Sequence, residues 1–339
     1  MVGPLQSQRA RLAFLSATAL AGTIGCATVH PVPMREIITT GSYGAPSADR
    51  RFTLVRPASA DERVPADRVL VVALHGCTQD AADMARGTRL TEAAEQDGYA
   101  ILYPEQPLSA NPKKCWNWYL PAETEHDAGE SGLLAALVDS VARDRQVSPN
   151  HVMLVGMSAG AAMAASLAIN HASRYGALVM HSGVPALAAH NVLEALGVMQ
   201  KGVSSAGALG NATHSAMGSE ARRIPTLIIQ GKADKLVSPA NMDVLVTQWM
   251  TANDLADGGR RSHVDEMLNG AVYATPGHGV TGSRVINVRG LSIVESWSVE
   301  GLGHAWSGGS ATGTYTDPST PDATAIIRDF LRRVLREGR

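Results

Sequence analysis

The stretch Gly156-Met157-Ser158-Ala159-Gly160 decides the fold, because this G-x-S-x-G motif lies between two segments of different character. The apolar run 151–155 before it is typical of a buried parallel strand, and the small apolar residues 161–168 after it favour a helix. A serine on such a strand-to-helix turn has its hydroxyl lifted clear of the sheet, beside the free N–H groups of the helix N-terminus. Although a chain with 33 glycines can contain the motif by chance, this context predicts that Ser158 is a catalytic nucleophile.

Apolar runs alternate with helix-favouring segments along the rest of the chain. Strands are expected at 68–75, 99–103, 150–156, 177–181, 225–230 and 291–299, and helices at 88–97, 130–145, 158–170, 239–252 and 321–336. This alternation predicts an α/β fold with a mostly parallel, doubly wound sheet that is covered by helices on both faces. Active sites of such sheets lie at the carboxyl ends of the strands, so polar residues that directly follow predicted strands are the candidates.

Candidates for the acid and the base follow the serine in the expected order of serine, acid and histidine. Asp234 lies in the loop after the strand at 225–230, and His304 lies in a glycine-flanked loop after the strand at 291–299. We therefore predict that His304 takes the proton of Ser158 and that Asp234 orients His304. Among the 11 histidines the competitors for the base are His75, His126 and His181, and the competitors for the acid are Asp243, Asp317 and Asp322.

An oxyanion hole needs two backbone N–H donors aimed at one point. The N–H of Ala159, directly after the nucleophile, is the first candidate. The second is the N–H of Cys77, because His75-Gly76-Cys77-Thr78-Gln79 follows the apolar, strand-like run 69–74. Loss of one such donor typically raises the reaction barrier by roughly 3–4 kcal/mol.

Further motifs are spread over roughly residues 50 to 335. They are Leu74-His75-Gly76-Cys77-Thr78-Gln79, Cys115-Trp116-Asn117-Trp118-Tyr119, Gly129-Glu130, the serine motif extended to Met163, Gln248-Trp249 and Gly301-Leu302-Gly303-His304-Ala305-Trp306. On these motifs the chain resembles the polyhydroxybutyrate-depolymerase family of α/β-hydrolase esterases. The motifs around Cys77 and Cys115 are much more specific than the serine motif alone.

The resemblance implies the same site as the order of the residues does, with no metal and no organic cofactor: nucleophile Ser158, acid Asp234, base His304, and oxyanion donors Cys77 and Ala159. The chain departs from the family at Ala161, where a glycine is usual, and the stretch 122–127 (Ala-Glu-Thr-Glu-His-Asp) follows none of its patterns. Feruloyl esterases, acetylxylan esterases and a poly(aspartic acid) hydrolase group are related, and fold alone does not separate them.

Three of the five tryptophans fall in the predicted site loops. Trp306, two residues after the base, is predicted to line an acyl or alcohol pocket. Trp116 and Trp118 are also candidates for substrate contacts, and packing beneath their loop is the alternative for either one. The segment 201–220, rich in alanine, glycine and serine, lies where such hydrolases insert a lid, and a plain surface loop is the alternative.

The composition agrees with a globular enzyme. A chain of 339 residues with 45% hydrophobic residues can bury a large core within one α/β domain. The formal net charge of −2 gives no reason to expect a nucleic acid or an anionic membrane surface as partner. We therefore expect the partner to be a small or oligomeric ester substrate.

The N-terminus is predicted to be a targeting segment. Arg9 and Arg11 precede an apolar run at 12–24 that is too short to span a bilayer, so residues 1–26 are interpreted as a signal peptide. Cys26 is a candidate for lipidation, as in a bacterial lipoprotein, and would then tether the protein to a membrane. Ordinary secretory cleavage near this position is the alternative.

After the signal, residues 27–48 are expected to form a flexible arm and residues 49–339 the catalytic domain. The enzyme is expected to be secreted, or periplasmic and anchored to the outer membrane of a bacterium. Cys77 and Cys115 are then the cysteines left beside Cys26, and an oxidising compartment favours a disulfide between them. Two free thiols are the alternative.

These patterns predict a secreted or lipid-anchored serine esterase that cleaves short-chain hydroxyalkanoate esters or oligomers through an acyl-enzyme. The enzymatic alternatives are a feruloyl- or acetylxylan-type esterase and a poly(aspartate) hydrolase, which a cationic rim around the pocket would favour. The non-enzymatic alternative is a catalytically dead binding lipoprotein. Because the run 323–335 at the end of the chain is followed by no Thr-, Pro- or Ser-rich linker, we expect faster hydrolysis of soluble oligomers than of crystalline polymer.

Overall fold

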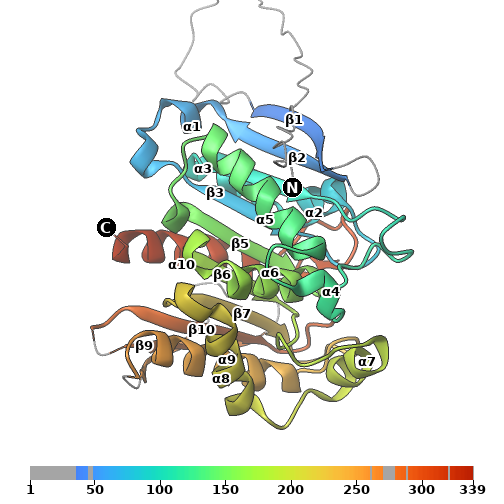
Figure 1. Cartoon of the computed structure of the whole chain (residues 1–339), viewed down its shortest axis with the longest axis vertical. Helices are drawn as coiled ribbons and strands as arrows, with labels where there is room; N and C mark the ends of the chain where they lie inside the picture. Colours follow the sequence, from blue (N-terminus) through green and yellow to red (C-terminus); the bar gives the residue numbers. More distant parts are fainter. Residues whose placement is uncertain are drawn as a thin grey trace, which may run out of the picture.

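One mixed β-sheet runs through the middle of the molecule (Figure 1). The computed structural model describes residues 36–44, 49–259, 262–269, 279–287, 289–319 and 321–338. The strand order is β1-β2-β4-β3-β5-β6-β7-β10-β9-β8, with the bounds β1 Glu36–Tyr43, β2 Arg50–Pro57, β3 Leu70–Leu74, β4 Ala100–Pro104, β5 Val152–Met157, β6 Ala177–His181, β7 Thr226–Gly231, β8 His263–Asn269, β9 Val280–Ile286 and β10 Ser292–Val299. The central strands from β4 to β10 in this order are mutually parallel, and antiparallel strands extend both edges.

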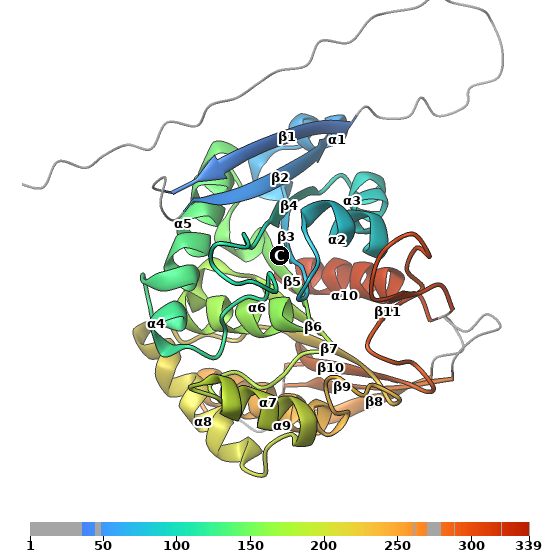
Figure 2. The ribbon, with the colours of Figure 1, turned by 90° about the vertical axis from the view of Figure 1, so that its right-hand side faces the viewer.

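Helices cover both faces of the sheet (Figure 2). On one face, α5 (Gly129–Asp144), α6 (Ala159–Asn170) and α9 (Ala240–Ala256) pack over one apolar core. On the other face, α2 (Ala81–Thr88), α3 (Leu90–Asp97) and α10 (Ala323–Glu337) pack over a second core. The other α-helices of the described residues are α1 (Ala58–Glu62), α4 (Pro121–Thr124), α7 (Val192–Lys201) and α8 (Ala206–Met217). Covered on both sides, β3 and β5 are buried along their whole length, which explains their continuous apolar sequences.

The predicted doubly wound architecture is confirmed, and the six predicted strands are the six central parallel ones. The helix expected at 88–97 is α3, which begins two residues later at Leu90, because Arg89 adopts a left-handed backbone conformation (φ 57°) that separates α3 from the preceding helix α2. The antiparallel edge strands were not among the predicted elements. Their sequences mix polar with apolar residues, as in β2, whose pattern of buried and exposed residues is irregular.

The expected flexible arm at 27–48 is wrong for residues 36–43, which form β1 and pair with β2 in antiparallel register. This pairing gives one side of the edge strand β1 hydrogen-bond partners on β2 and explains why the segment is ordered. The predicted signal peptide at 1–26, with Cys26, lies outside the described residues. Within the described ranges, the structure contains no helix that combines the length and the apolar character needed to cross a bilayer.

Residues 201–220 form neither a lid nor a plain loop. Most of them belong to α8, which packs against α9: Gln248 Nε2 donates to Thr213 Oγ1 at 2.9 Å, and a Cβ on Gly210 would press into Thr251. Helix α8 is therefore part of the outer helical layer on that face of the sheet.

Candidate active site

Ser158 occupies the turn between β5 and α6, where the motif predicts it. Its backbone has φ 55° and ψ −121°, and residues other than glycine rarely adopt a positive φ. Helix α6 begins against β3 so closely that a Cβ on Gly160 would overlap the carbonyl oxygens of Leu74 and His75. The Ser158 N–H donates to His181 O at 2.9 Å, which fixes the turn to the end of β6. The turn therefore has the strained geometry of a nucleophile elbow.

The predicted acid and base meet directly. His304 Nδ1 lies 2.7 Å from Asp234 Oδ2, and both side chains are almost completely buried. Their two loops are joined through the backbone, because Ala233 N donates to Leu302 O at 2.9 Å and a Cβ on Gly231 would overlap the same oxygen. Since an ionised carboxylate only accepts hydrogen bonds, the contact assigns the proton to His304 Nδ1 and leaves Nε2 as an acceptor.

The surroundings of Asp234 keep it ionised. Its Oδ1 accepts the backbone N–H groups of Leu236 and Val237, each at 2.9 Å, and its Oδ2 accepts Gln230 Nε2 at 3.1 Å. Burial by itself would raise the pKa of Asp234, but the hydrogen bond and charge of His304, together with the two backbone donors, hold that pKa below its usual value. A fixed negative charge therefore faces the imidazole of His304.

Trp306 does not line a substrate pocket, contrary to the prediction. Its side chain is fully buried, its indole N–H donates to Thr324 Oγ1 at 3.1 Å, and its ring stacks on His181 with ring centroids 4.9 Å apart. Burial lowers the pKa of His181 to about 3, so that this ring adds no second positive charge beside His304. His181, one of the competitors for the base, is thus fully buried and has no access to a substrate.

The predicted oxyanion donors lie on either side of the nucleophile. A Cβ on Gly76 would stand 3.5 Å from Ser158 Cβ, so the loop after β3 passes directly beside the serine. The Gly76 N–H donates to Gln79 Oε1 at 2.9 Å, which closes this loop on itself. Among the described residues, the N–H groups of Cys77 and Ala159 donate to no protein acceptor. Two free backbone donors are therefore available near Ser158.

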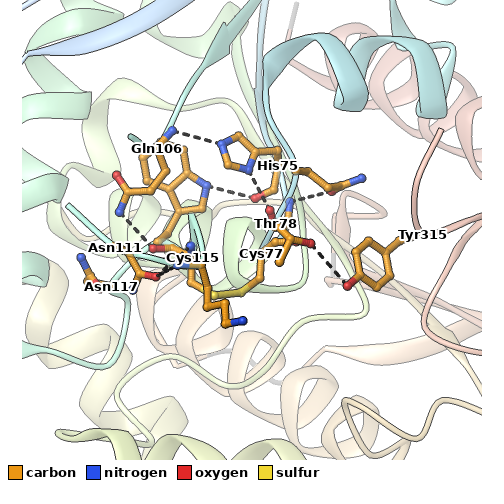
Figure 3. The surroundings of a disulfide bond; sticks show 12 residues. His75, Cys77, Thr78, Gln106, Asn111, Cys115, Asn117 and Tyr315 are labelled. Atoms are coloured by element: carbon orange, nitrogen blue, oxygen red, sulfur yellow. Dashed lines mark hydrogen bonds between the residues drawn. A yellow bond between two sulfur atoms is a disulfide. The ribbon is translucent and has the colours of Figure 1, made fainter. Parts of the chain in front are cut away.

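A disulfide joins this loop to the tryptophan-bearing loop, as predicted (Figure 3). Cys77 and Cys115 are bonded with their Cα atoms 4.2 Å apart, and Thr78 N donates to Lys113 O at 2.7 Å. The His75 ring accepts the Gln106 N–H at 3.1 Å. These contacts fix the Cys77 N–H in place. His75, another competitor for the base, is buried and accepts the Gln106 N–H, so it helps to hold these loops together.

Trp116 packs beneath its loop and does not reach the cavity, so the packing alternative holds for it. It is fully buried, and its indole N–H donates to His75 O at 3.0 Å. The buried carboxylate of Glu130 organises the same loop, accepting Asn117 N at 2.8 Å, Asn117 Nδ2 at 2.7 Å and a bond from Gln106 Nε2. Burial raises the pKa of Glu130 above its usual value despite these donors. The Gly129-Glu130 motif thus supports the tryptophan-bearing loop, which the disulfide joins to the loop at 75–79 that carries Cys77, here called the oxyanion loop.

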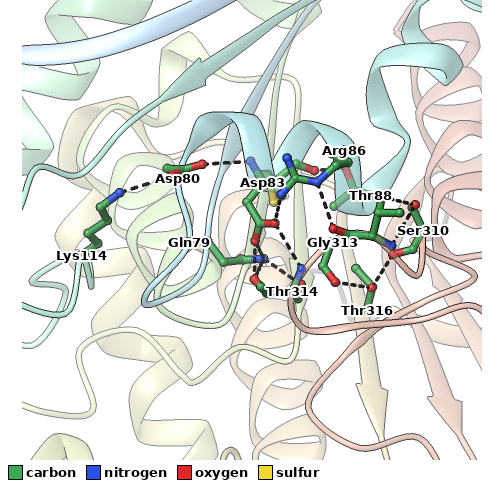
Figure 4. Close-up of polar contacts among 12 residues, drawn as sticks. Gln79, Asp80, Asp83, Arg86, Thr88, Lys114, Ser310, Gly313, Thr314 and Thr316 are labelled. Atoms are coloured by element: carbon green, nitrogen blue, oxygen red, sulfur yellow. Dashed lines mark hydrogen bonds and ion pairs between the residues drawn. The ribbon is translucent and has the colours of Figure 1, made fainter.

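Hydrogen bonds among Gln79, Asp83 and Thr314, here called the latch, hold the other side of the oxyanion loop (Figure 4). The sequence did not predict them. Gln79 Nε2 donates to Thr314 O at 3.0 Å and to Asp83 Oδ2 at 3.1 Å, and Thr314 Oγ1 also bonds to Asp83. The latch holds the segment that carries Tyr315, whose ring meets the His304 ring edge-on with centroids 6.0 Å apart. Gln79, the last residue of its motif, thereby connects the loop at 75–79 to the surroundings of His304.

Ser158 lines a cavity of about 430 Å³, a usual size for a small-molecule site. Trp118 is among the residues that line it, and substrate contact by this side chain stays a prediction. Helix α7 supplies a wall that was not predicted. Among the described residues that line the cavity, Lys113 is the one charged side chain. The full lining is Cys77, Asn111, Pro112, Lys113, Cys115, Trp118, Tyr119, Ser158, Ala159, Val184, Val192, Ala195, Leu196, Met199 and Val237.

The structure brings Asp234 and His304 into contact but does not join Ser158 to His304. Within the described part of the chain, the Ser158 hydroxyl makes no direct hydrogen bond to the imidazole. Val237 links the two halves of the site, because its side chain lines the same cavity as Ser158 and its N–H binds Asp234. Catalytic hydrogen bonds in unliganded enzymes are often long and tighten only when substrate binds.

The sequence matches the family described as esterase PHB depolymerase over residues 51–268. It is 28% identical over 261 residues to Poly(3-hydroxyalkanoate) depolymerase C of Paucimonas lemoignei, covering 76% of this chain and 58% of that protein. It is 25% identical over 196 residues to acetylxylan esterase A of Emericella nidulans, covering 56% of this chain and 64% of that protein. The chain thus spans less than two thirds of the length of either relative.

The fold has a close counterpart among solved structures. An acetyl xylan esterase from Aspergillus awamori superimposes with a TM-score of 0.65 at 18% identity, covering 84% of this chain and 94% of that one. At this identity the likeness concerns the fold, and it confirms the α/β-hydrolase architecture. With the family match extending over most of the catalytic sheet, the chain belongs to the esterase PHB depolymerase family of α/β-hydrolases.

Proposed function

We propose that the protein is a serine esterase whose catalytic triad is Ser158, Asp234 and His304. The observation that carries the proposal is the position of Ser158, on a strained strand-to-helix turn that opens into an apolar cavity. The tight His304–Asp234 contact and the two free backbone donors beside Ser158 supply the other parts that acyl transfer needs. The names of the two relatives, a depolymerase and an acetylxylan esterase, agree with this class of reaction.

In the proposed reaction, His304 Nε2 accepts the hydroxyl proton while Ser158 Oγ bonds to the carbonyl carbon of the ester. The negative charge that develops on the carbonyl oxygen accepts hydrogen bonds from the N–H groups of Cys77 and Ala159. His304 then returns its proton to the departing alkoxide, which leaves the acyl group on Ser158. A water molecule then gives a proton to His304 and its oxygen bonds to the acyl carbon. When the bond from this carbon to Ser158 Oγ breaks, His304 returns the proton to Oγ, which releases the carboxylic acid and restores the serine.

We propose short-chain hydroxyalkanoate esters or oligomers as the substrate class. The cavity walls of Trp118, Val192, Leu196 and Met199 suit a compact apolar acyl or alcohol group. A poly(aspartate) substrate would require several cationic side chains at this cavity. Among the described residues that line it, Lys113 is the one cation. An acetylxylan or feruloyl ester is the second candidate, supported by the Emericella nidulans relative.

Two measurements test the proposal. A fluorophosphonate probe should label wild-type protein at Ser158 and leave Ser158→Ala unlabelled, and this variant should lose roughly 10⁴–10⁶ in turnover. Asp234→Asn should lose about 10⁴, because the imidazole is then held in the wrong tautomer. Unimpaired turnover of Ser158→Ala would contradict the mechanism, and an unlabelled wild-type protein without turnover would favour the binding lipoprotein.

A substrate panel then separates the classes. Dissolved hydroxybutyrate trimer, acetylated xylan, feruloylated xylan and poly(aspartate) are compared at equal concentrations of cleavable bonds. The proposal expects the highest kcat/KM on the trimer. A preference for either xylan ester would reassign the substrate while keeping the triad.

We also propose export from the cytoplasm, with Cys26 as a candidate lipid anchor. The Cys77–Cys115 disulfide supports an oxidising compartment. The test is the mass of the mature N-terminus in wild-type and Cys26→Ser cells: a diacylglycerol-sized increment on Cys26 means anchoring, and a plain cleaved terminus means secretion. An unprocessed N-terminus in the cytoplasm would contradict export.

A further inference from the structure

Two histidines and an aspartate meet at the far end of α6 from Ser158. His126 and Asp127 lie in the loop between α4 and α5, and His171 directly follows α6. One ligating atom from each of the three side chains can be chosen so that all lie within 4.8 Å of one another. This loop belongs to the stretch of sequence that matches no pattern of the family.

The three side chains make one close contact of hydrogen-bond length and leave one wider gap, at His171. His126 Nδ1 is 2.8 Å from Asp127 Oδ2, and Asp127 Oδ1 is 3.9 Å from His171 Nδ1, too far for a hydrogen bond. The two imidazole rings stand with centroids 4.5 Å apart. Two ligands that are each about 2.0–2.1 Å from a tetrahedral zinc ion are about 3.4 Å from each other. The measured separations lie on either side of that value, so small side-chain rotations would bring the atoms onto one ion.

His171 supplies the independent observation. Its side chain is fully buried, yet neither Nδ1 nor Nε2 has a hydrogen-bond partner in the described part of the chain. Buried polar atoms without partners are rare, because each lacks the hydrogen bond it would make in water. Nδ1 is the nitrogen nearest Asp127. A metal ion bound there would provide the missing partner for that nitrogen.

The backbone around the site is tied together across the two segments. Asn170, the residue before His171, donates from Nδ2 to Thr124 O at 2.6 Å and to Ser131 Oγ at 3.0 Å. These bonds hold the end of α6 against the loop that carries His126. The positive charge of the nearby Arg174 is engaged by Asp139 at 2.6 Å, which reduces its repulsion of a cation.

The donor set indicates the kind of metal. Two imidazole nitrogens and one carboxylate are ligands typical of zinc and neighbouring transition metals, whereas calcium and magnesium prefer sites made of oxygen alone. His126 and Asp127 are 52% and 66% exposed, so water can reach the remaining coordination position.

We propose that His126, Asp127 and His171 form a binding site for a divalent transition metal such as Zn²⁺, separate from the ester-cleaving centre. The bound ion would clamp the α4–α5 loop to the end of α6. Trp118 and Thr124 line a common hollow near this loop, and Trp118 also lines the catalytic cavity. The clamp would therefore steady the segment that leads to one wall of the active site.

The test is Zn²⁺ binding by the untagged full chain after chelator treatment and dialysis, followed by calorimetry. One equivalent should bind to wild-type protein and raise its Tm. His126→Ala and Asp127→Asn, both exposed changes that should leave folding intact, should each weaken Zn²⁺ binding at least tenfold and abolish the rise in Tm. His190→Ala is the matched control, because His190 forms an exposed pair with Glu194 at 3.2 Å but belongs to no such cluster among the described residues.

Each outcome decides the proposal. Stoichiometric binding that both cluster variants lose and His190→Ala keeps would establish the site. Absence of stoichiometric binding, equal binding by the two cluster variants and wild type, or tighter binding of Ca²⁺ than of Zn²⁺ would overturn it. Ester hydrolysis by Ser158 does not enter these readouts, so a failure of the proposed esterase function would leave this result unaffected.

Discussion

Removing the Cys77–Cys115 disulfide tests how the oxyanion loop is held. The bridge closes a loop with a sequence separation of 38 residues. In the chain-entropy model, a loop of this length corresponds to about 4 kcal/mol of stability at 25 °C. For a protein of this size, that loss lowers the Tm by about 6 °C. The double variant Cys77→Ala, Cys115→Ala keeps the backbone N–H that we assign to the oxyanion hole, so stability and catalysis can be compared in one protein.

Catalysis should fall much less than stability, because other contacts hold the same loop. Gly76 N still donates to Gln79, Thr78 N to Lys113 O and the Trp116 indole to His75 O. We expect a decrease in kcat within about tenfold, well short of the 10²–10³ that follows the loss of an oxyanion donor.

Urea unfolding of the wild-type protein and the double variant, with and without reductant, measures the effect. Reductant should destabilise the wild-type protein toward the double variant and leave the double variant unchanged. Equal stability of the two proteins without reductant would refute the entropic reasoning. A loss of kcat above 10³ with the fold intact would show that the bridge, and not the hydrogen bonds, positions the donor.

The other predictions concern the elbow, the acid response and the cavity rim. Gly160→Ala should give unfolded or strongly destabilised protein in urea titrations, because its Cβ would overlap backbone of β3, whereas Gly207→Ala, with open space around it, should be neutral or stabilising. Burial would raise the pKa of Asp97, but hydrogen bonds and charges of Arg328 and Arg332 hold it below its usual value. The ionised Asp97 therefore stabilises the folded protein above about pH 4, and this contribution is lost as the pH falls through the lowered pKa. Asp97→Asn should cost about 1–3 kcal/mol at pH 7 and flatten the loss of stability on acidification; an unchanged pH profile would contradict this. Leu193 on α7 is 80% exposed, and Leu193→Asp should slow the hydrolysis of polyester film several-fold more than the hydrolysis of dissolved trimer. Leu255→Asp on α9 is the control. Equal effects of Leu193→Asp on both substrates would show that this surface of α7 does not touch the polymer.

The parts of the site that follow strands in the sheet could be predicted from sequence. Ser158, Asp234 and His304 each lie directly beyond a parallel strand, and the strand order brings these carboxyl ends to one edge. The local pattern at each position therefore carries the information. The Asp234–His304 contact is a consequence of two adjacent parallel strands, β7 and β10.

The tryptophans show where sequence reasoning fails. Trp306, close to the base in sequence, points into the core and stacks on His181, while Trp118 reaches the cavity. Proximity along a loop does not determine which side of the loop a ring occupies. That choice depends on partners distant in sequence, here Thr324 for one ring and His75 for Trp116. These hydrogen bonds satisfy indole N–H groups that burial would otherwise leave unpaired.

The division between chemistry and specificity follows from the same fold. The groups that we propose to react are fixed by the sheet and by backbone contacts that tolerate little change, such as the close approach of Gly160 to β3. The cavity wall opposite them comes from α7, which follows β6 after a long connection and bears the exposed apolar residues Val192, Leu193 and Leu196. A wall built on a surface helix can change its side chains without disturbing the elbow or the Asp234–His304 pair. We therefore expect substitutions on α7 to alter KM and substrate preference, and substitutions at the glycines of the elbow to abolish folding or turnover altogether.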